Sequence, residues 1–343
     1  MAETSFALYR KYRPDSFKKV RNQSHIISVL EGAIAKGMIP HALLFTGSRG
    51  TGKTTVARIF AHAIGAKDID IYEIDAASNR GIDDIRALKE AVYTLPYESP
   101  YKVYIIDEVH MLTKEAWNAL LKTLEEPPEY VVFILATTEQ DKILDTITSR
   151  CQVFTFRAPS RDELKEIVLD IAREEGLSMS QGGADVIALA ANGSYRDALS
   201  IMQKVIMANG DAELGEDEIA TIVGAPKSIL IVDFIRAFEE KKPEAAIAVL
   251  ATVLKTHIDI RIFHSMLLER IRTILLLRHK AITKESIVGY TPAELEIIIV
   301  CASNLKSPVN SGLLVRFLEA GERIASAHIP TLPLELAVIE GMS

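Results

Sequence analysis

The residues best suited to chemistry form the segment GSRGTGKT at 47–54, which fits the spacing G-x4-G-K-T without a mismatch. Glycines at this spacing let backbone N–H groups approach phosphate oxygens, and a helix that starts at the loop adds its positive end. A glycine-rich turn that matches by chance is the alternative, but the segment lies between a strand-like run and a helical pattern. Lys53 suits the outer phosphates and Thr54 suits a Mg²⁺ ion. The residues expected to bind ATP are Gly47, Ser48, Arg49, Gly50, Thr51, Gly52, Lys53, Thr54 and Thr55.

A second candidate is the segment KVYIIDEVH at 102–110, an apolar strand that ends in two carboxylates. In a parallel sheet this strand end lies at the edge where ligands bind. Asp107 can hold Mg²⁺ through water, and Glu108 can orient and polarise an attacking water molecule. The alternative is a pair of solvated acids after a strand, which is common in isolation. Together with the glycine-rich loop, the pair predicts ATP binding with Mg²⁺, followed by hydrolysis.

Three further residues could assist this chemistry. The strand VVFILATT at 131–138 ends in two threonines, and Thr138 could position the water. Arg150, which follows a third strand end, could act in trans on the nucleotide of a neighbouring subunit; a surface salt bridge is the alternative. Arg196 near the start of a helix could fold over the nucleotide and report its phosphate state; pairing with a nearby acid is the alternative.

The pattern of apolar residues predicts the elements that position these groups. Continuous β-branched runs that alternate with helical stretches indicate a parallel sheet covered on both faces. A helix over 23–36 is expected behind a Ser24 cap. From about residue 160 only helical patterns remain, and Gly224-Ala225-Pro226 is the best second boundary. The expected strands are 42–46, 71–74, 103–106, 131–136 and 153–156, with helices near 53–64, 82–95 and 114–126 between them.

Composition excludes several classes of protein. The chain has 343 residues, of which 48% are apolar and 25% charged, as in ordinary globular proteins. Two cysteines, Cys151 and Cys301, allow neither a disulfide framework nor a four-cysteine zinc site. No apolar run approaches the ~20 residues that cross a bilayer, and the N-terminus has no apolar signal core. We therefore expect a cytoplasmic protein without a membrane partner.

The net charge of −7 argues, taken alone, against a nucleic-acid binder. Its distribution is uneven, because residues 1–157 hold 20 basic and 20 acidic side chains and the acidic excess lies in the rest of the chain. The first 21 residues hold six basic side chains. The overall count therefore hides a locally basic start.

The quoted motifs, taken together, resemble the bacterial DNA polymerase III gamma/tau subunits, which are the ATPases of the sliding-clamp loader and belong to the AAA+ class. The resemblance is dense over roughly residues 8–205. The segments that carry it are YRKYRPDSF at 9–17, GSRGTGKTT at 47–55, EIDAASNRGIDDIR at 73–86, the block from Val103 to Ile143, TSRCQVFTF at 148–156 and GSYRDALS at 193–200.

The resemblance implies an α/β P-loop NTPase (AAA+) domain with a parallel sheet over 1–158. A small helical lid at 159–223 and an all-helical oligomerisation collar at 224–343 would follow. Thr138 matches the first sensor, Arg150 the arginine finger acting in trans, and Arg196 the second sensor.

The resemblance also implies partners: other clamp-loader subunits, the sliding clamp and primer–template DNA. A hetero-pentameric loader is implied, with a homo-oligomer as the alternative for the chain in isolation. Arg80 and Arg86 stand where the family's inner surface follows DNA, although a solvated helix face is the alternative for both.

Two departures qualify the resemblance. Family members usually insert a four-cysteine zinc module after the P-loop helix, whereas AHAIGAKDIDIYEID runs directly into the next strand, so no zinc is expected. The segment Val20–Gln23 replaces the family's usual turn near the adenine, which leaves open the base contacts, including those of Tyr9 and Tyr12. The chain is expected to be a short form, without the tail of tau-type members.

Two other functions stay open at this point. One is another AAA+ DNA motor, for branch migration or helicase loading. The other is an ATP-binding scaffold without significant turnover. Glu108 and Arg150 argue against it, because a scaffold needs neither a catalytic base nor an arginine finger.

Overall fold

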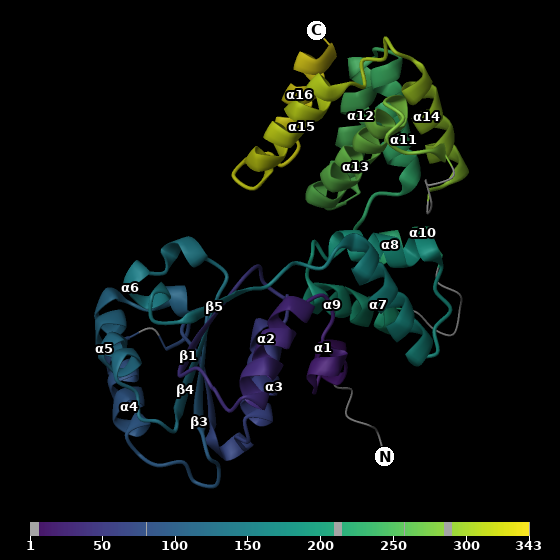
Figure 1. Ribbon diagram of the computed structural model, residues 1–343. Helices are drawn as coiled ribbons and strands as arrows, with labels where there is room; N and C mark the ends of the chain where they lie inside the picture. The colour runs from purple at the N-terminus through teal and green to yellow at the C-terminus, as the bar shows by residue number, and fades with distance from the viewer. Residues whose placement is uncertain (1–6, 80, 209–214, 257, 285–289, 343) are drawn as a thin grey trace. The chain divides into compact units, whose positions relative to one another are not determined.

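The computed structural model describes residues 7–79, 81–208, 215–256, 258–284 and 290–342 (Figure 1). The chain divides into two compact units. The first contains Met1–Ser160 together with Gly193–Asp197, and the second contains Arg161–Asn192 and Ala198–Ser343. The division into lid and collar at residue 224 stays a prediction.

The first unit is built on a five-stranded parallel sheet with the order β2-β3-β4-β1-β5. This confirms the predicted α/β fold. All residues of the central strands β1 and β4 are buried, as expected for strands that are covered on both faces. The strands are β1 (Ala42–Thr46), β2 (Ile71–Asp75), β3 (Lys102–Asp107), β4 (Val131–Thr137) and β5 (Gln152–Thr155).

Helices cover both faces of this sheet (Figure 1). On one face, α2 (Ser24–Ala35) and α3 (Lys53–Ala63) pack on side chains such as Phe45 of β1. On the other, α4 (Ile82–Val92) and α5 (Lys114–Glu125) pack on the alternate strand residues. The remaining short elements are α1 (Leu8–Lys11), η1 (Phe17–Lys19), η2 (Asp68–Asp70), η3 (Val109–Met111), η4 (Gln140–Lys142) and α6 (Asp145–Thr148).

Two local expectations were wrong. Ser24 is the first residue of α2 rather than its cap, because Gln23 occupies the cap position and uses its side chain to bond Arg157. Helix α4 ends at Val92 instead of near residue 95. The Lys102 ammonium donates to the Ala91 carbonyl at 2.8 Å, which satisfies a carbonyl at the end of this helix.

The second unit is helical in the part of the chain that the structure describes. No helix there or in the first unit is long and apolar enough, among the described residues, to span a membrane. The helices are α7 (Arg161–Glu174), α8 (Gln181–Ala190), α9 (Tyr195–Ala208), which starts in the first unit, α10 (Glu216–Val223), α11 (Ser228–Glu239), α12 (Pro243–Lys255), α13 (Ile260–Arg278), α14 (Pro292–Ser303), α15 (Ser311–Ile324) and α16 (Leu332–Met342).

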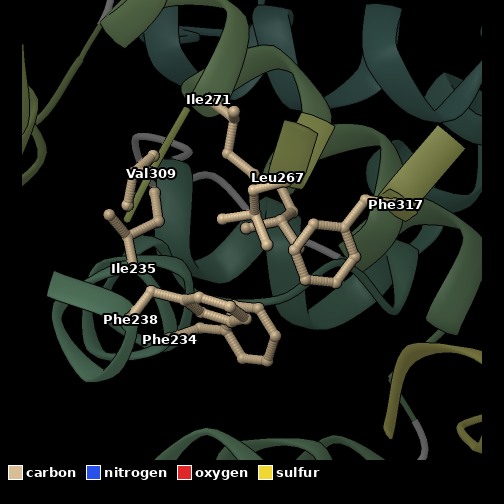
Figure 2. A pocket seen from close by; sticks show the side chains of 8 residues that line it. Phe234, Ile235, Phe238, Leu267, Ile271, Val309 and Phe317 are labelled. Carbon is tan, nitrogen blue, oxygen red and sulfur yellow. The ribbon is translucent and has the colours of Figure 1, made fainter. Parts of the chain in front are cut away.

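Aromatic packing joins the helices α11, α13 and α15. The rings of Phe234 and Phe238 on α11 lie 5.8 and 5.6 Å from the ring of Phe317 on α15. Leu267 of α13 completes this contact, as Figure 2 shows. These side chains fill the space between the helices and leave no room for a water molecule. Such close packing makes the core of this unit sensitive to small changes in volume.

A buried histidine fixes α13 against α15. The Nε2 atom of His264 lies 2.7 Å from the Phe317 carbonyl oxygen, and its ring fills the space that a Cβ atom would need at Gly321. Burial lowers the pKa of His264, although the hydrogen bond to Phe317 opposes the shift. The folded chain therefore binds this proton less readily than the unfolded chain does.

We expect the second unit to lose stability as the pH falls below 6.5, the ordinary pKa of histidine. Below this pH the histidine of the unfolded chain binds a proton more readily than His264 of the folded chain does. The free energy of unfolding therefore decreases as the pH is lowered. Urea unfolding followed by circular dichroism at pH 7.5 and 5.5 measures this change. His264→Gln should reduce the pH dependence, whereas the exposed control His328→Gln should leave it unchanged. An unchanged pH dependence in His264→Gln would contradict the assignment.

Candidate nucleotide-hydrolysis site

The loop between β1 and α3 has the backbone conformation that its glycines predict. Gly47, Gly50 and Gly52 have φ angles of 140°, 74° and 99°. A Cβ atom at Gly47 would approach the carbonyl oxygen of Phe156 to 2.6 Å, and one at Gly50 would overlap the Ser194 side chain. Glycine is therefore required here both for backbone conformation and for space.

Lys53 is buried inside this loop. Its Nζ atom donates to the carbonyl oxygens of Gly47 at 2.8 Å and Ser48 at 2.9 Å. Burial lowers the pKa of Lys53, while the carboxylates of Glu108 and Asp107 oppose the shift. A desolvated ammonium with only carbonyl acceptors would gain from phosphate oxygens, so this loop fits the phosphates of ATP.

Thr54 and Asp107 meet at the carboxyl edge of the sheet. The Thr54 hydroxyl donates to Asp107 Oδ2 at 2.7 Å, and Asp107 Oδ1 accepts from the Glu108 N–H at 3.0 Å. Hydroxyl and carboxylate oxygens are the ligands that Mg²⁺ prefers, with water and phosphates completing its shell. The pair fits a Mg²⁺ ion delivered with ATP.

Glu108 turns away from the strand direction and meets the end of β4. Its φ of 48° places it in the left-handed region, which costs a residue other than glycine roughly 1–2 kcal/mol. Such strain concentrates at functional sites. The carboxylate accepts from the Thr138 hydroxyl at 2.9 Å and from the Thr138 N–H at 3.3 Å. The structure thus brings together the two residues that the sequence nominated as base and sensor.

Arg196 also lies with the first unit. The N–H of Tyr195 donates to the Gly50 carbonyl at 3.1 Å, which fixes the start of α9 on the loop. The guanidinium of Arg196 lies 5.1 Å from the centre of the Tyr9 ring, within range of a cation–π interaction. The predicted second sensor is therefore part of the same unit as the loop.

Sequence reasoning missed two residues at this site. Arg13 donates through Nε to the Thr55 hydroxyl at 3.1 Å. Burial, with Arg58 and Arg196 close by, lowers the pKa of Arg13, while Glu73 opposes the shift. The cluster of basic residues at the start of the chain was the feature of the sequence that could have pointed to Arg13. His110, the second residue, lies between Glu108 and the end of β4, and no pattern in the sequence singled it out.

Arg150 contacts residues outside this cluster. Arg150 donates to the Thr146 carbonyl and forms an ion pair with Glu125, both at 2.6 Å. Arg86 is exposed on α4, and Arg80 lies outside the described residues. Among the loop residues, Arg49 is exposed. The catalytic and binding roles of all these residues stay predictions.

Across the described ranges no group of three or more His, Cys, Asp or Glu residues is arranged to hold a metal ion. Residues 64–70 connect α3 to β2, where a cysteine module was expected to be missing. The prediction that the chain binds no zinc stays a prediction.

Known proteins similar to this chain are DNA polymerase III subunits. The tau subunit of Bacillus subtilis is 42% identical over 270 residues, which cover 73% of this chain and 48% of that protein. The gamma/tau subunit of Mycobacterium tuberculosis is 35% identical over 295 residues, which cover 79% and 51%. The tau subunit of Escherichia coli is 36% identical over 264 residues, which cover 71% and 41%. Over most of its length the chain is therefore similar to DNA polymerase III gamma/tau subunits.

Two further comparisons concern part of the chain and its fold. A family model described as DNA polymerase III, delta subunit, matches residues 65–160. The RuvB Holliday junction branch migration motor of Thermotoga maritima has the same fold, with a TM-score of 0.52 and 22% identity over 70% of this chain and 85% of that one. The chain spans about half the length of the gamma/tau relatives it matches.

We expect Gly50→Ala to destabilise the first unit more than Gly52→Ala. Both changes place a Cβ atom at a residue with positive φ, but only at Gly50 would this atom collide with the Ser194 side chain. Such overpacking costs about 1–3 kcal/mol. Trp117, the single tryptophan, is buried in this unit, so its fluorescence reports the thermal midpoint of this unit.

Ser194→Gly should restore part of the stability of Gly50→Ala. The Ser194 hydroxyl accepts from the Asp197 N–H at 3.1 Å as a helix cap, and glycine replaces such a cap at a cost of a few tenths of a kcal/mol. Equal thermal midpoints for Gly50→Ala and Gly52→Ala would contradict the close contact between Gly50 and Ser194.

Proposed function

We propose that the chain is the ATP-driven motor subunit of a replicative sliding-clamp loader. The observation that carries the proposal is the cluster of Lys53, Thr54, Asp107, Glu108 and Thr138 at one edge of the sheet, in a chain similar to gamma/tau subunits. This set contains a group for each task of ATP hydrolysis. A chain that only bound nucleotide would not need Glu108 and Thr138.

The chain would act as an ATPase through these residues. Backbone N–H groups of residues 47–54 and the Lys53 ammonium would hold the phosphates, and Mg²⁺ on Thr54 and Asp107 would neutralise charge on them. Glu108 would accept a proton from the attacking water, and Thr138 would fix the position of the Glu108 carboxylate and the water. Both hydrogen bonds from Thr138 go to Glu108 Oε2, so Glu108 Oε1 can accept a hydrogen bond from the attacking water.

Arg150 would serve as an arginine finger for a neighbouring subunit. Its ion pair with Glu125 is half exposed, so the interaction is worth little and can be exchanged. The guanidinium could then stabilise charge on the transferred phosphoryl group. Arg196 would act as the second sensor from the start of α9. ATP turnover would thus depend on assembly.

Assembly would use the helices α15 and α16, which belong to the predicted collar. Five large apolar side chains on these two helices are exposed, with exposed fractions from 41% to 52%. Apolar surface of this kind marks interfaces between proteins. We propose that it contacts the equivalent helices of other loader subunits. The side chains are Val315, Leu318, Leu332, Leu336 and Ile339.

The sliding clamp and primer–template DNA are the proposed partners of the assembled loader. Arg86 on α4 is the described residue proposed to contact DNA, and Arg80 is proposed with it from the sequence alone. A few such arginines in each subunit would suffice, because affinity for DNA comes from the release of counterions at phosphates.

Steady-state ATP hydrolysis by the chain alone, and with loader subunits, clamp and primed DNA, tests this function. We expect low turnover alone and strong stimulation in the complete mixture. Glu108→Gln should bind ATP but lose about 10²–10⁴ in rate, as expected when a general base is removed. Arg150→Ala should bind ATP normally, and its rate of ATP hydrolysis should fall by a factor of about 10³ or more. The control Arg173→Ala, on an exposed arginine of α7, should hydrolyse ATP normally.

Equal turnover with and without clamp and DNA would contradict the loader function. Mixing Glu108→Gln with Arg150→Ala chains tests action in trans, because a mixed interface combines an intact Glu108 with an intact Arg150. Activity in the mixture above that of either variant is expected. Full activity of Arg150→Ala would contradict the role of Arg150 as an arginine finger.

Assembly is tested by Leu318→Glu combined with Leu336→Glu, which places two charges in the proposed interface. Burying an unpaired carboxylate costs several kcal/mol, so association with partner subunits should weaken by at least tenfold. Leu305→Glu is the control, since Leu305 is 83% exposed outside these helices. Sedimentation velocity measures the assembly. Unchanged assembly of the double variant would contradict this interface.

A further inference from the structure

His110 occupies a position that no assigned role explains. It lies in η3, which follows the strand that ends at Asp107 and the turn residue Glu108, and only 6% of its side chain is exposed. Its Nδ1 atom lies 3.0 Å from the Thr137 hydroxyl and 3.5 Å from Glu108 Oε2. Its Nε2 atom lies 3.1 Å from Glu139 Oε1. One ring thus contacts the base and the two residues that flank Thr138.

The hydrogen-bond inventory assigns the protons of this ring. The buried Thr137 hydroxyl already accepts from the Glu139 N–H at 3.0 Å. Within the described residues its own proton has one acceptor, the Nδ1 atom of His110. A protonated Nδ1 would leave that proton without an acceptor, which is costly for a buried group. Nδ1 is therefore an acceptor.

The other nitrogen carries the proton. A carboxylate accepts hydrogen bonds and cannot donate them, so an unprotonated Nε2 would repel the nearby Glu139 oxygen. Lys142 occupies the second oxygen of Glu139 at 2.7 Å, which keeps this carboxylate charged and in place. The ring is therefore neutral, in the Nε2–H form.

We propose that His110 is a positioning residue for ATP hydrolysis, which in its neutral Nε2–H form ties the end of β4 to the turn that carries Glu108. The link runs from Glu139 through the ring to the Thr137 hydroxyl, and it sets the position of Thr138 against the Glu108 carboxylate. Because the ring is neutral, it does not form an ion pair that would compete with water for Glu108. This inference rests on the proposed ATPase function and adds a residue to it.

Three variants test the link between His110 and Thr137. Glutamine at 110 can reach toward Glu139 but gives the Thr137 hydroxyl no acceptor, whereas asparagine places its amide where Nδ1 stood. We expect His110→Gln and Thr137→Val each to lower kcat about tenfold, since small displacements of reacting groups have large effects on rate. The Kd for ATP should stay within about twofold of its original value. His110→Asn should retain most of the activity.

A double-mutant cycle separates positioning from general damage. If the two residues act through one contact, His110→Gln combined with Thr137→Val should lower kcat no further than either change alone. Thr123→Val is the control, because Thr123 is a buried threonine of α5 whose hydroxyl has no partner among the described residues. Additive losses, or full kcat in both single variants, would overturn the proposal.

Nitrogen-15 NMR of the histidine rings tests the proton assignment without measuring activity. The signals missing from His110→Asn identify the ring, which should show an unprotonated Nδ1 and a protonated Nε2. A protonated Nδ1 would overturn the proposal. An unaltered chain that fails to hydrolyse ATP with its partners would refute the ATPase function, whereas normal kcat in His110→Gln and Thr137→Val would refute only this role.

Discussion

The position of β4 between β1 and β3 is the constraint on which the site depends. Thr46 at the end of β1 pairs with Thr137 at the end of β4, and Ile106 of β3 pairs with Leu135. These registers place the glycine-rich loop, the two carboxylates and the threonines of β4 at one edge. A shift of one residue in β4 would exchange the side chains packed on one face with those packed on the other, and the two sets differ in volume. Close packing on both faces therefore holds the register, and the register fixes the site.

Much of this arrangement follows from patterns that act over short distances. The strand predicted at 42–46 agrees with the structure, and the one predicted at 103–106 is a residue short at each end. Buried parallel strands are continuous apolar runs, which makes them visible in a sequence. The glycine-rich loop is equally visible, because its glycines and lysine lie within eight residues of one another.

Contacts between residues far apart in the sequence could not be predicted from such patterns. The hydrogen bond from Thr138 to Glu108 spans 30 residues, and the one from Arg13 to Thr55 spans 42. The expected Ser24 cap was wrong because Gln23 takes the cap position, and the partner of its side chain, Arg157, lies 134 residues away. Tertiary partners decide such positions, and a propensity scale cannot contain them.

The same edge of the sheet combines charges of both signs in a way that favours an anionic ligand. Burial lowers the pKa values of both Lys53 and Arg13, and Arg58 and Arg196 lower that of Arg13 further. Glu73 pairs with Arg58, while Asp107 is bonded to Thr54. Phosphate oxygens near Lys53 and Arg13 would lower the cost of burying these two cations, so binding of a nucleotide would stabilise the first unit by mass action.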